Sequence, residues 1–140
     1  MTNECSPVVV VPCSGIGKAL GSVSREAAYV LCEELRPEAT QLVALSKLVL
    51  GEPGAQAQVS RSPVIAIDGC KLRCAAKLVA ERGGKPALEV AVLDAFRRHP
   101  ELKPQGIAEL NEGGLALARA LAGELALEVD ALGRPGGSHA

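Results

Sequence analysis

Hydrophobic and polar positions along the chain form blocks that predict strands and helices in alternation. Val8–Val11 and Val64–Ile67 are short apolar runs, mostly of β-branched residues, which is typical of strands buried on both faces of a parallel sheet. After each run, apolar residues recur at helical spacing, over 20–31 and over 72–79. The first two thirds of this pattern therefore predict two strand–helix units.

The remaining segments continue the alternation less regularly. Leu42–Leu45 fits either a second strand or the first turn of a helix, and the Gly-, Pro-, Gln- and Ser-rich segment 51–62 is predicted to be a loop with room for a short helix. Ala87–Leu93 is a further predicted strand, and residues 94–106 are expected to be irregular and polar. Leucines between 110 and 125 indicate a closing helix, in which two adjacent glycines leave a break open.

This order of elements predicts a small three-layer Rossmann-like α/β domain, with a mostly parallel sheet and helices on both faces. The 140 residues suit one domain, which we place at residues 1–132, followed by a disordered tail at 133–140. Hydrophobic residues make up 48% of the chain and aromatic residues only 1%, so the core must consist of aliphatic side chains.

Charge and hydropathy exclude two classes of partner. The formal net charge is -1, without the clustered positive charge that non-specific nucleic-acid binding requires. No stretch reaches the roughly 20 apolar residues of a membrane span, and the short run at Val8–Val11 lacks the flanks of a signal peptide. We therefore expect a cytoplasmic protein that binds neither nucleic acid nor membranes, and the sequence gives no indication of its oligomeric state.

Three of the five cysteines follow the predicted buried strands. Cys13 comes after the first run and Cys70 after the run that ends at Ile67, so both belong to the carboxyl edge of a parallel sheet, where ligands bind. Cys74 lies about one helical turn beyond Cys70. If the two strands are neighbours, these thiols can reach one metal ion. The helix N-termini nearby favour the thiolate, which binds metals or acts as a nucleophile, and Asp68 opposes this unless it caps the helix.

Four other candidate ligands are placed away from this edge. Cys5 precedes the first strand and is expected at the opposite end of the sheet. Cys32 lies near the far end of the first helix, off its apolar face, and we interpret both thiols as uninvolved. His99 and His139 are expected on the surface.

The loop after the first strand contains Ser14, Gly15 and Gly17 and could suggest a phosphate-binding loop. The order and spacing fit neither the G-x4-G-K-[ST] nor the G-x-G-x-x-G pattern. We interpret the glycines as allowing a tight turn and close helix packing, and the loop as a place where a small anion could bind at a helix start.

Two segments, P-C-S-G-I-G-K at 12–18 and V-I-A-I-D-G-C-K-L-R-C-A-A-K at 64–77, resemble the family of small zinc-binding proteins named for its DGC motif. The resemblance extends from about Val8 to the closing helix. It implies that the cysteines are metal ligands, with zinc as the inferred metal. The family has a further cysteine in a C-L-A-like segment that corresponds here to Val43–Ser46, so Ala44 or a neighbour replaces that thiol.

The sequence leaves several functions open and does not decide whether the protein is an enzyme. The first hypothesis is zinc bound by Cys13, Cys70 and Cys74, with Asp68 supporting the ligands or serving as a fourth one. Such a site keeps a coordination position open, where a small sulfur- or selenium-containing ligand could bind. The alternatives are a three-cysteine [4Fe–4S] cluster that removes sulfur from a substrate, a metal-free thiol redox or persulfide carrier, and a scaffold that has lost its metal.

Overall fold

Four parallel strands form the predicted sheet, in a computed structural model that describes residues 7–13, 18–69, 72–106 and 109–133. The order of the strands in the sheet is β2-β1-β3-β4, and every neighbouring pair is parallel. The first and third strands are direct neighbours, with Val10 beside Ile65. The strands are β1 (Val8–Pro12), β2 (Thr40–Leu42), β3 (Val64–Asp68) and β4 (Pro86–Ala91).

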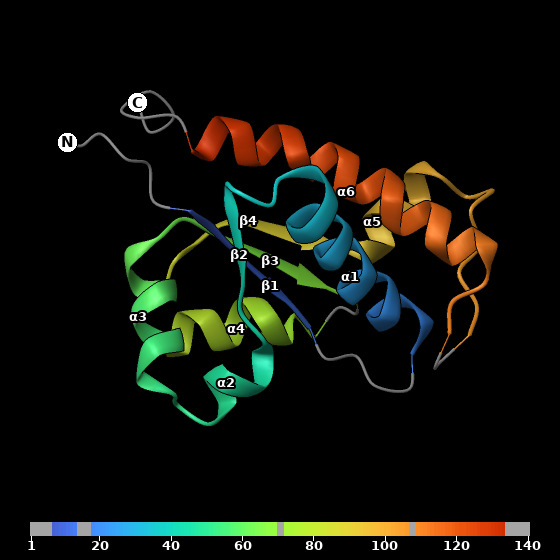
Figure 1. Cartoon of the computed structure of the whole chain (residues 1–140). Helices are drawn as coiled ribbons and strands as arrows, with labels where there is room; N and C mark the ends of the chain where they lie inside the picture. The colour runs from blue at the N-terminus through green and yellow to red at the C-terminus, as the bar shows by residue number, and fades with distance from the viewer. Residues whose placement is uncertain (1–6, 14–17, 70–71, 107–108, 134–140) are drawn as a thin grey trace.

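Helices cover both faces of the sheet, so the three-layer Rossmann-like arrangement is confirmed (Figure 1). One face carries α1, α5 and α6, and the other carries α2, α3 and α4. The helical segments are α1 (Ala19–Tyr29), the π-helix η1 (Val30–Leu35), α2 (Leu45–Val49), α3 (Pro53–Arg61), α4 (Cys74–Glu81), α5 (Val92–Arg98) and α6 (Glu112–Leu132).

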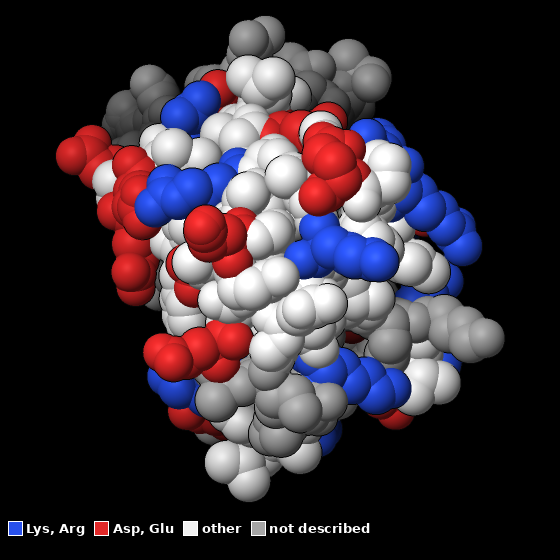
Figure 2. Space-filling model, turned by 90° about the vertical axis from the view of Figure 1, so that its right-hand side faces the viewer, with Lys and Arg blue, Asp and Glu red and all other residues white. Residues whose placement is uncertain are grey.

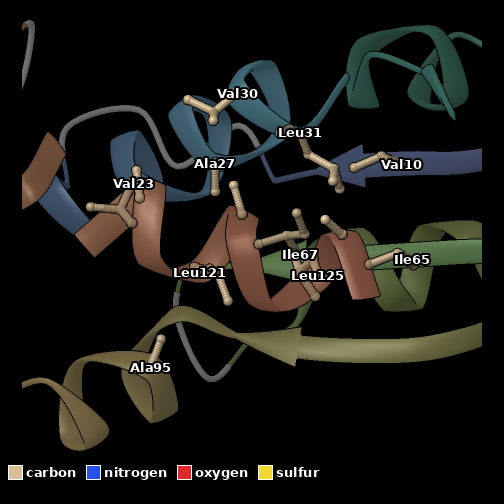
Figure 3. Close-up of a cluster of buried hydrophobic side chains, with 14 of the residues drawn as sticks. Val10, Val23, Ala27, Val30, Leu31, Ile65, Ile67, Ala95, Leu121 and Leu125 are labelled. Carbon is tan, nitrogen blue, oxygen red and sulfur yellow. The ribbon is translucent and has the colours of Figure 1, made fainter. Parts of the chain in front are cut away.

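The alternation of side chains along each strand separates the core into two layers. Val8 and Val10 of β1 face α1 and α6, whereas Val9 and Val11 face the opposite layer, and all four are fully buried. Figure 3 shows the larger layer, where Leu121 and Leu125 of α6 pack among side chains of α1 and β3. Burial on both faces explains why the strands read as continuous apolar runs.

The structure resolves one open segment and corrects another. Residues 42–45 contain both the end of a strand and the start of a helix, because β2 ends at Leu42 and α2 begins at Leu45. The expectation that residues 94–106 are irregular is wrong for their first part, since α5 continues to Arg98 directly from β4. No Gly or Pro separates strand from helix there, and the apolar run therefore read as one strand.

Two glycine-containing segments are more helical than their composition indicates. The segment 51–62 contains α3, which starts with Pro53 at its first position and turns Ala55 and Val59 into the core. The two glycines at the start of the closing helix do not break it. They belong to its first turn, after Asn111, whose side chain accepts a hydrogen bond from the N–H of Gly114 at 2.8 Å.

The end of the first helix departs from the predicted wheel. The N–H of Arg36 donates to the carbonyl of Leu31 at 2.8 Å, and the wider π turn shifts the faces of η1. Cys32 is consequently half-buried against the core, and its expected position off the apolar face is wrong. Burial raises the pKa of the Cys32 thiol, a hydrogen bond with Thr40 opposes this rise, and Glu33 adds to it.

Among the described residues, none of the helices combines the length and the hydropathy that crossing a bilayer would require. Of the predicted tail at 133–140, only Gly133 belongs to the described residues.

Candidate functional site

The carboxyl ends of β1 and β3 lie side by side at a topological switch point. The chain leaves β1 toward α1 on one face of the sheet and leaves β3 toward α4 on the other face, so the two connections diverge (Figure 1). Such divergence opens a crevice in which α/β proteins bind their ligands. The adjacency on which the cysteine hypothesis depended is therefore present in the fold.

Cys13 lies at this edge with its thiol in a polar setting. The residue is 4% exposed, and its Sγ accepts a hydrogen bond from the N–H of Gly69 at 3.1 Å. Its Sγ also lies 3.3 Å from the Oγ of the buried Ser24, which donates to the carbonyl of Gly21 at 2.6 Å. Because the single hydroxyl proton of Ser24 is used in that bond, the Ser24 Oγ can accept a hydrogen bond from a neutral Cys13 thiol.

Gly69 links the two strand ends to the start of α1. A Cβ atom at this position would lie 2.6 Å from the backbone nitrogen of Gly21 and 2.7 Å from the carbonyl carbon of Leu20. The glycine of the D-G-C segment is thus needed for the close approach of β3 to α1. This approach also brings its N–H to the Cys13 thiol.

Asp68 caps α4 from the end of β3. Its two carboxylate oxygens accept hydrogen bonds from the N–H groups of Ala75 at 2.8 Å and Ala76 at 3.2 Å. The carboxylate is buried, and it stands in for a cap that the residue before the helix does not provide. Asp68 therefore positions the start of α4. The first residue of this helix is Cys74, whose thiol is exposed.

The turn that leads into α4 is held in an unusual conformation. Arg73 adopts left-handed backbone angles, with φ of 56°, and is the only non-glycine residue with positive φ in the part of the chain that the structure describes. Such a conformation costs about 1–2 kcal/mol for a side chain of this kind. Its guanidinium forms an ion pair with Glu89 on β4.

Ala44 also lies at the carboxyl edge. It follows β2 as the residue that precedes α2, two positions after Leu42, which pairs with Val10 of β1. Ala44 therefore lies beside the end of β1, and its side chain offers no donor atom to a metal.

Several predicted site residues lie outside the described residues, namely Cys70, Ser14, Gly15 and Gly17. Among the described residues alone, no group of three or more His, Cys, Asp or Glu side chains could hold a metal ion. Cys13 and Cys74 are both free thiols on the carboxyl side of the sheet, and Cys70 follows Gly69 directly in the chain. The donor set is soft sulfur, which suits zinc or an iron–sulfur cluster.

Sequence reasoning missed two neighbours of the Cys13 thiol. Ser24 sits mid-helix and looks like a surface residue, because no local pattern shows that α1 crosses the end of β1. Gly69 was interpreted only as part of the D-G-C motif. Its close approach to the α1 backbone occurs at Gly21, a second glycine in the facing helix. Two facing glycines are the signal that could have indicated this contact.

The model of one protein family, described as the DGC domain, matches residues 9–112 of the chain. The match includes both cysteine segments and all four strands apart from the first residue of β1. A search of curated proteins and a search of solved structures each find no match.

Proposed function

Because the chain belongs to the DGC domain family, we propose that it is a small metal-binding protein that holds zinc through Cys13, Cys70 and Cys74. The observation that carries the proposal is the hydrogen bond from the Gly69 N–H to the Cys13 Sγ. It connects the thiol of Cys13, after β1, to the residue that precedes Cys70. Two segments that are 56 residues apart in the sequence are thus in contact at the switch point.

The side chains around the thiols support binding in distinct ways. The Gly69 N–H donates to the Cys13 sulfur, which would stabilise the charged ligand form. Asp68 fixes the first turn of α4 and thereby the position of Cys74. Zinc bound by three thiolates would supply a Lewis-acid position open to a small sulfur- or selenium-containing ligand. We place the protein in the cytoplasm, because a reducing compartment keeps metal-free thiols from forming disulfides.

The decisive experiment measures zinc, iron and acid-labile sulfide in protein purified without oxygen. We expect about one zinc per chain in the wild type, since three thiolates and one exchangeable ligand complete a tetrahedral site. Cys74→Ser should lose most of this zinc, and because Cys74 is exposed the substitution should leave the fold intact. Cys13→Ser and Cys70→Ser should have the same effect.

Cys32→Ser is the matched control, because it removes a thiol that lies in η1 and away from the sheet edge. Its zinc content should equal that of the wild type. Iron with sulfide in place of zinc would move the proposal to the three-cysteine [4Fe–4S] cluster. Equal zinc in all variants, or none in the wild type after reconstitution, would contradict zinc binding by these residues.

The exposure of Cys74 favours one alternative, a dithiol carrier. Cys70 would attack a disulfide acceptor and release one thiol, and Cys74 would then displace the second thiol to leave a Cys70–Cys74 disulfide. The protein gives up two electrons and two protons, which the acceptor takes up as two thiols. Cys74→Ser would trap the mixed disulfide at Cys70, which mass spectrometry would detect.

A further inference from the structure

A cavity lies beside the candidate site and is lined by the start of α1, the helix α5 and the segment 103–105. Its volume is about 570 Å³, and a second pocket of about 450 Å³ on the other side of Leu93 shares Gly69 and Leu93 with it. Leu20, Leu93 and Phe96 form its apolar lining, and Phe96 is the only phenylalanine of the chain. A space of this size accommodates a small organic molecule.

The charge of the α1 side of the cavity is one-signed. Lys18 and Lys103 line it, and among the described residues no acidic side chain does. Within the described part of the chain, neither lysine forms an ion pair. The first turn of α1 also contains no acidic residue, so the positive end of the helix adds to the field of the lysines.

The pocket on the other side of Leu93 is different, because carboxylates outnumber guanidinium groups in its lining. It is lined by three carboxylates and two guanidinium groups, and each guanidinium is paired with a carboxylate. The pairs are Arg73 with Glu89 and Arg97 with Asp94. Figure 2, which faces the carboxyl ends of the strands, shows basic and acidic side chains around a central uncharged surface. Charge complementarity therefore selects an anion for the α1 side only.

The wall that carries Lys103 is fixed by α6. Asn111 accepts a hydrogen bond from the N–H of Gln105 at 2.9 Å and donates to the carbonyl of Lys103 at 3.0 Å. Its own N–H donates to the carbonyl of Gln105 at 3.0 Å. A Cβ on Gly113 would collide with that same Lys103 carbonyl, so the segment packs directly on the helix backbone. A wall held in this way lowers the entropy cost of binding.

We propose that this cavity binds a small organic carboxylate with an apolar body. The carboxylate would lie between Lys18 and Lys103, and the apolar part would contact Leu93 and Phe96. Gly69 lines the cavity and donates to the Cys13 thiol, so the bound molecule would lie next to the sulfur ligands. Its role as the substrate of a metal centre rests on the proposed function, whereas the binding itself does not require the metal.

The test uses three probes that separate charge from apolar surface: phenylacetate, 2-phenylethylamine and acetate. Each is titrated into the ¹⁵N-labelled full chain, and the backbone amide shifts are followed. We expect phenylacetate to saturate shifts at Ala19, Phe96 and Gln105, and the other two probes to bind at least about tenfold more weakly. Failure of phenylacetate to saturate, or equal binding of all three, would overturn the proposal.

Paired lysine variants give the matched control. Lys18→Gln with Lys103→Gln should weaken phenylacetate binding at least about tenfold, and added salt should weaken it in the wild type. Lys47→Gln with Lys85→Gln removes the same charge from exposed positions elsewhere and should leave the affinity unchanged. Equal weakening in both double variants would show non-specific attraction and refute the cavity as the binding site.

Metal content distinguishes a failure of this proposal from a failure of the proposed function. Both double lysine variants should keep the zinc content of the wild type, because no lysine is a proposed ligand. If the wild type holds no zinc yet binds phenylacetate with the expected lysine dependence, the metal proposal fails and the cavity proposal stands. If zinc is present and phenylacetate does not bind, the cavity proposal fails and the metal proposal stands.

Discussion

At the scale of single residues, the buried carboxylate of Asp68 is predicted to stabilise the fold. Both of its oxygens accept hydrogen bonds from backbone N–H groups at the start of α4. Asp68→Asn keeps one acceptor but turns an NH2 group toward a second N–H, so we expect a loss of about 1–2 kcal/mol in the free energy of unfolding. Urea denaturation followed by circular dichroism measures this loss.

Asp94→Asn provides the control for the same chemical change. Asp94 is exposed on α5, and its contact is an ion pair with Arg97 at 3.6 Å. Exposed pairs of this kind contribute little, so the variant should stay within about 0.5 kcal/mol of the wild type. A loss as large as that of Asp68→Asn would show that the cap at α4 is not the cause.

The cysteines should differ in reactivity according to their surroundings. Burial raises the pKa of the Cys32 thiol above its ordinary value of 9.0, so this thiol stays protonated to higher pH. Cys74 is exposed at the start of α4. In metal-free protein at pH about 8, iodoacetamide should therefore modify Cys74 at least about tenfold faster than Cys32, because the thiolate is the nucleophile. Peptide mass spectrometry over time measures both rates.

The reactivity of Cys32 should rise only toward alkaline pH, in the direction that a raised pKa requires. In urea-unfolded protein the burial is lost, and the two rates should converge. If Cys32 reacts as fast as Cys74 in the folded protein, the π turn does not bury its thiol as the structure shows.

At the scale of elements, the contact between β3 and α1 decides how much space the site has. Gly69→Ala would place a Cβ at 2.6 Å from the Gly21 nitrogen, which forces the strand end and the helix apart. Because backbone atoms cannot yield as a flexible side chain can, we expect a destabilisation of about 1–3 kcal/mol or more. Thermal or urea denaturation gives the value.

Gly123→Ala tests the same exchange where there is room. Gly123 lies within α6, and nothing lies within 4 Å of a Cβ at this position. Alanine restricts the unfolded chain and favours the helix, so this variant should gain about 0.5–1 kcal/mol. Opposite signs for the two variants are required, and a loss at both positions would contradict the account.

The elements that the sequence predicted well are the strands that are buried on both faces, because such strands appear as continuous apolar runs. The apolar runs at Val8–Val11 and Val64–Ile67 became β1 and β3 within a residue at their ends. The helix α5 could not be predicted, because Val92 follows β4 without a turn residue and only tertiary packing bends the chain there. Two capping signals, Pro53 and Asn111, would have placed the starts of α3 and α6.

The candidate site was predictable only as far as the strand order was. The rule that ligands bind at the carboxyl ends of parallel strands placed Cys13 at this edge. The rule required the first and third strands to be neighbours, and β1 and β3 are neighbours in the structure. The cavity beside it could not be derived, since it brings together Lys18, Phe96 and Lys103 from three separate elements. Its walls depend on the contact of Asn111 with the segment 103–105, which no local pattern reveals.

At the scale of the whole molecule, a metal at the switch point would link the two helical layers. The connection after β1 leads to α1 and that after β3 leads to α4, on opposite faces of the sheet. Ligands from both connections must separate when the chain unfolds, so zinc should stabilise the folded state as a whole. At a hundredfold excess over Kd, the gain is about 2.7 kcal/mol.

Urea denaturation with zinc and with a chelator measures this gain for each variant. Cys74→Ser should lose it and Cys32→Ser should keep it, because only the first removes a proposed ligand. Ala44→Cys should enlarge it, since Ala44 follows β2 beside the end of β1 and a thiol there would offer a fourth donor. A zinc effect of equal size in all three variants would mean that the ion stabilises the chain elsewhere. An unchanged effect in Ala44→Cys alone would mean that this edge position is too far from the three thiols to close the site.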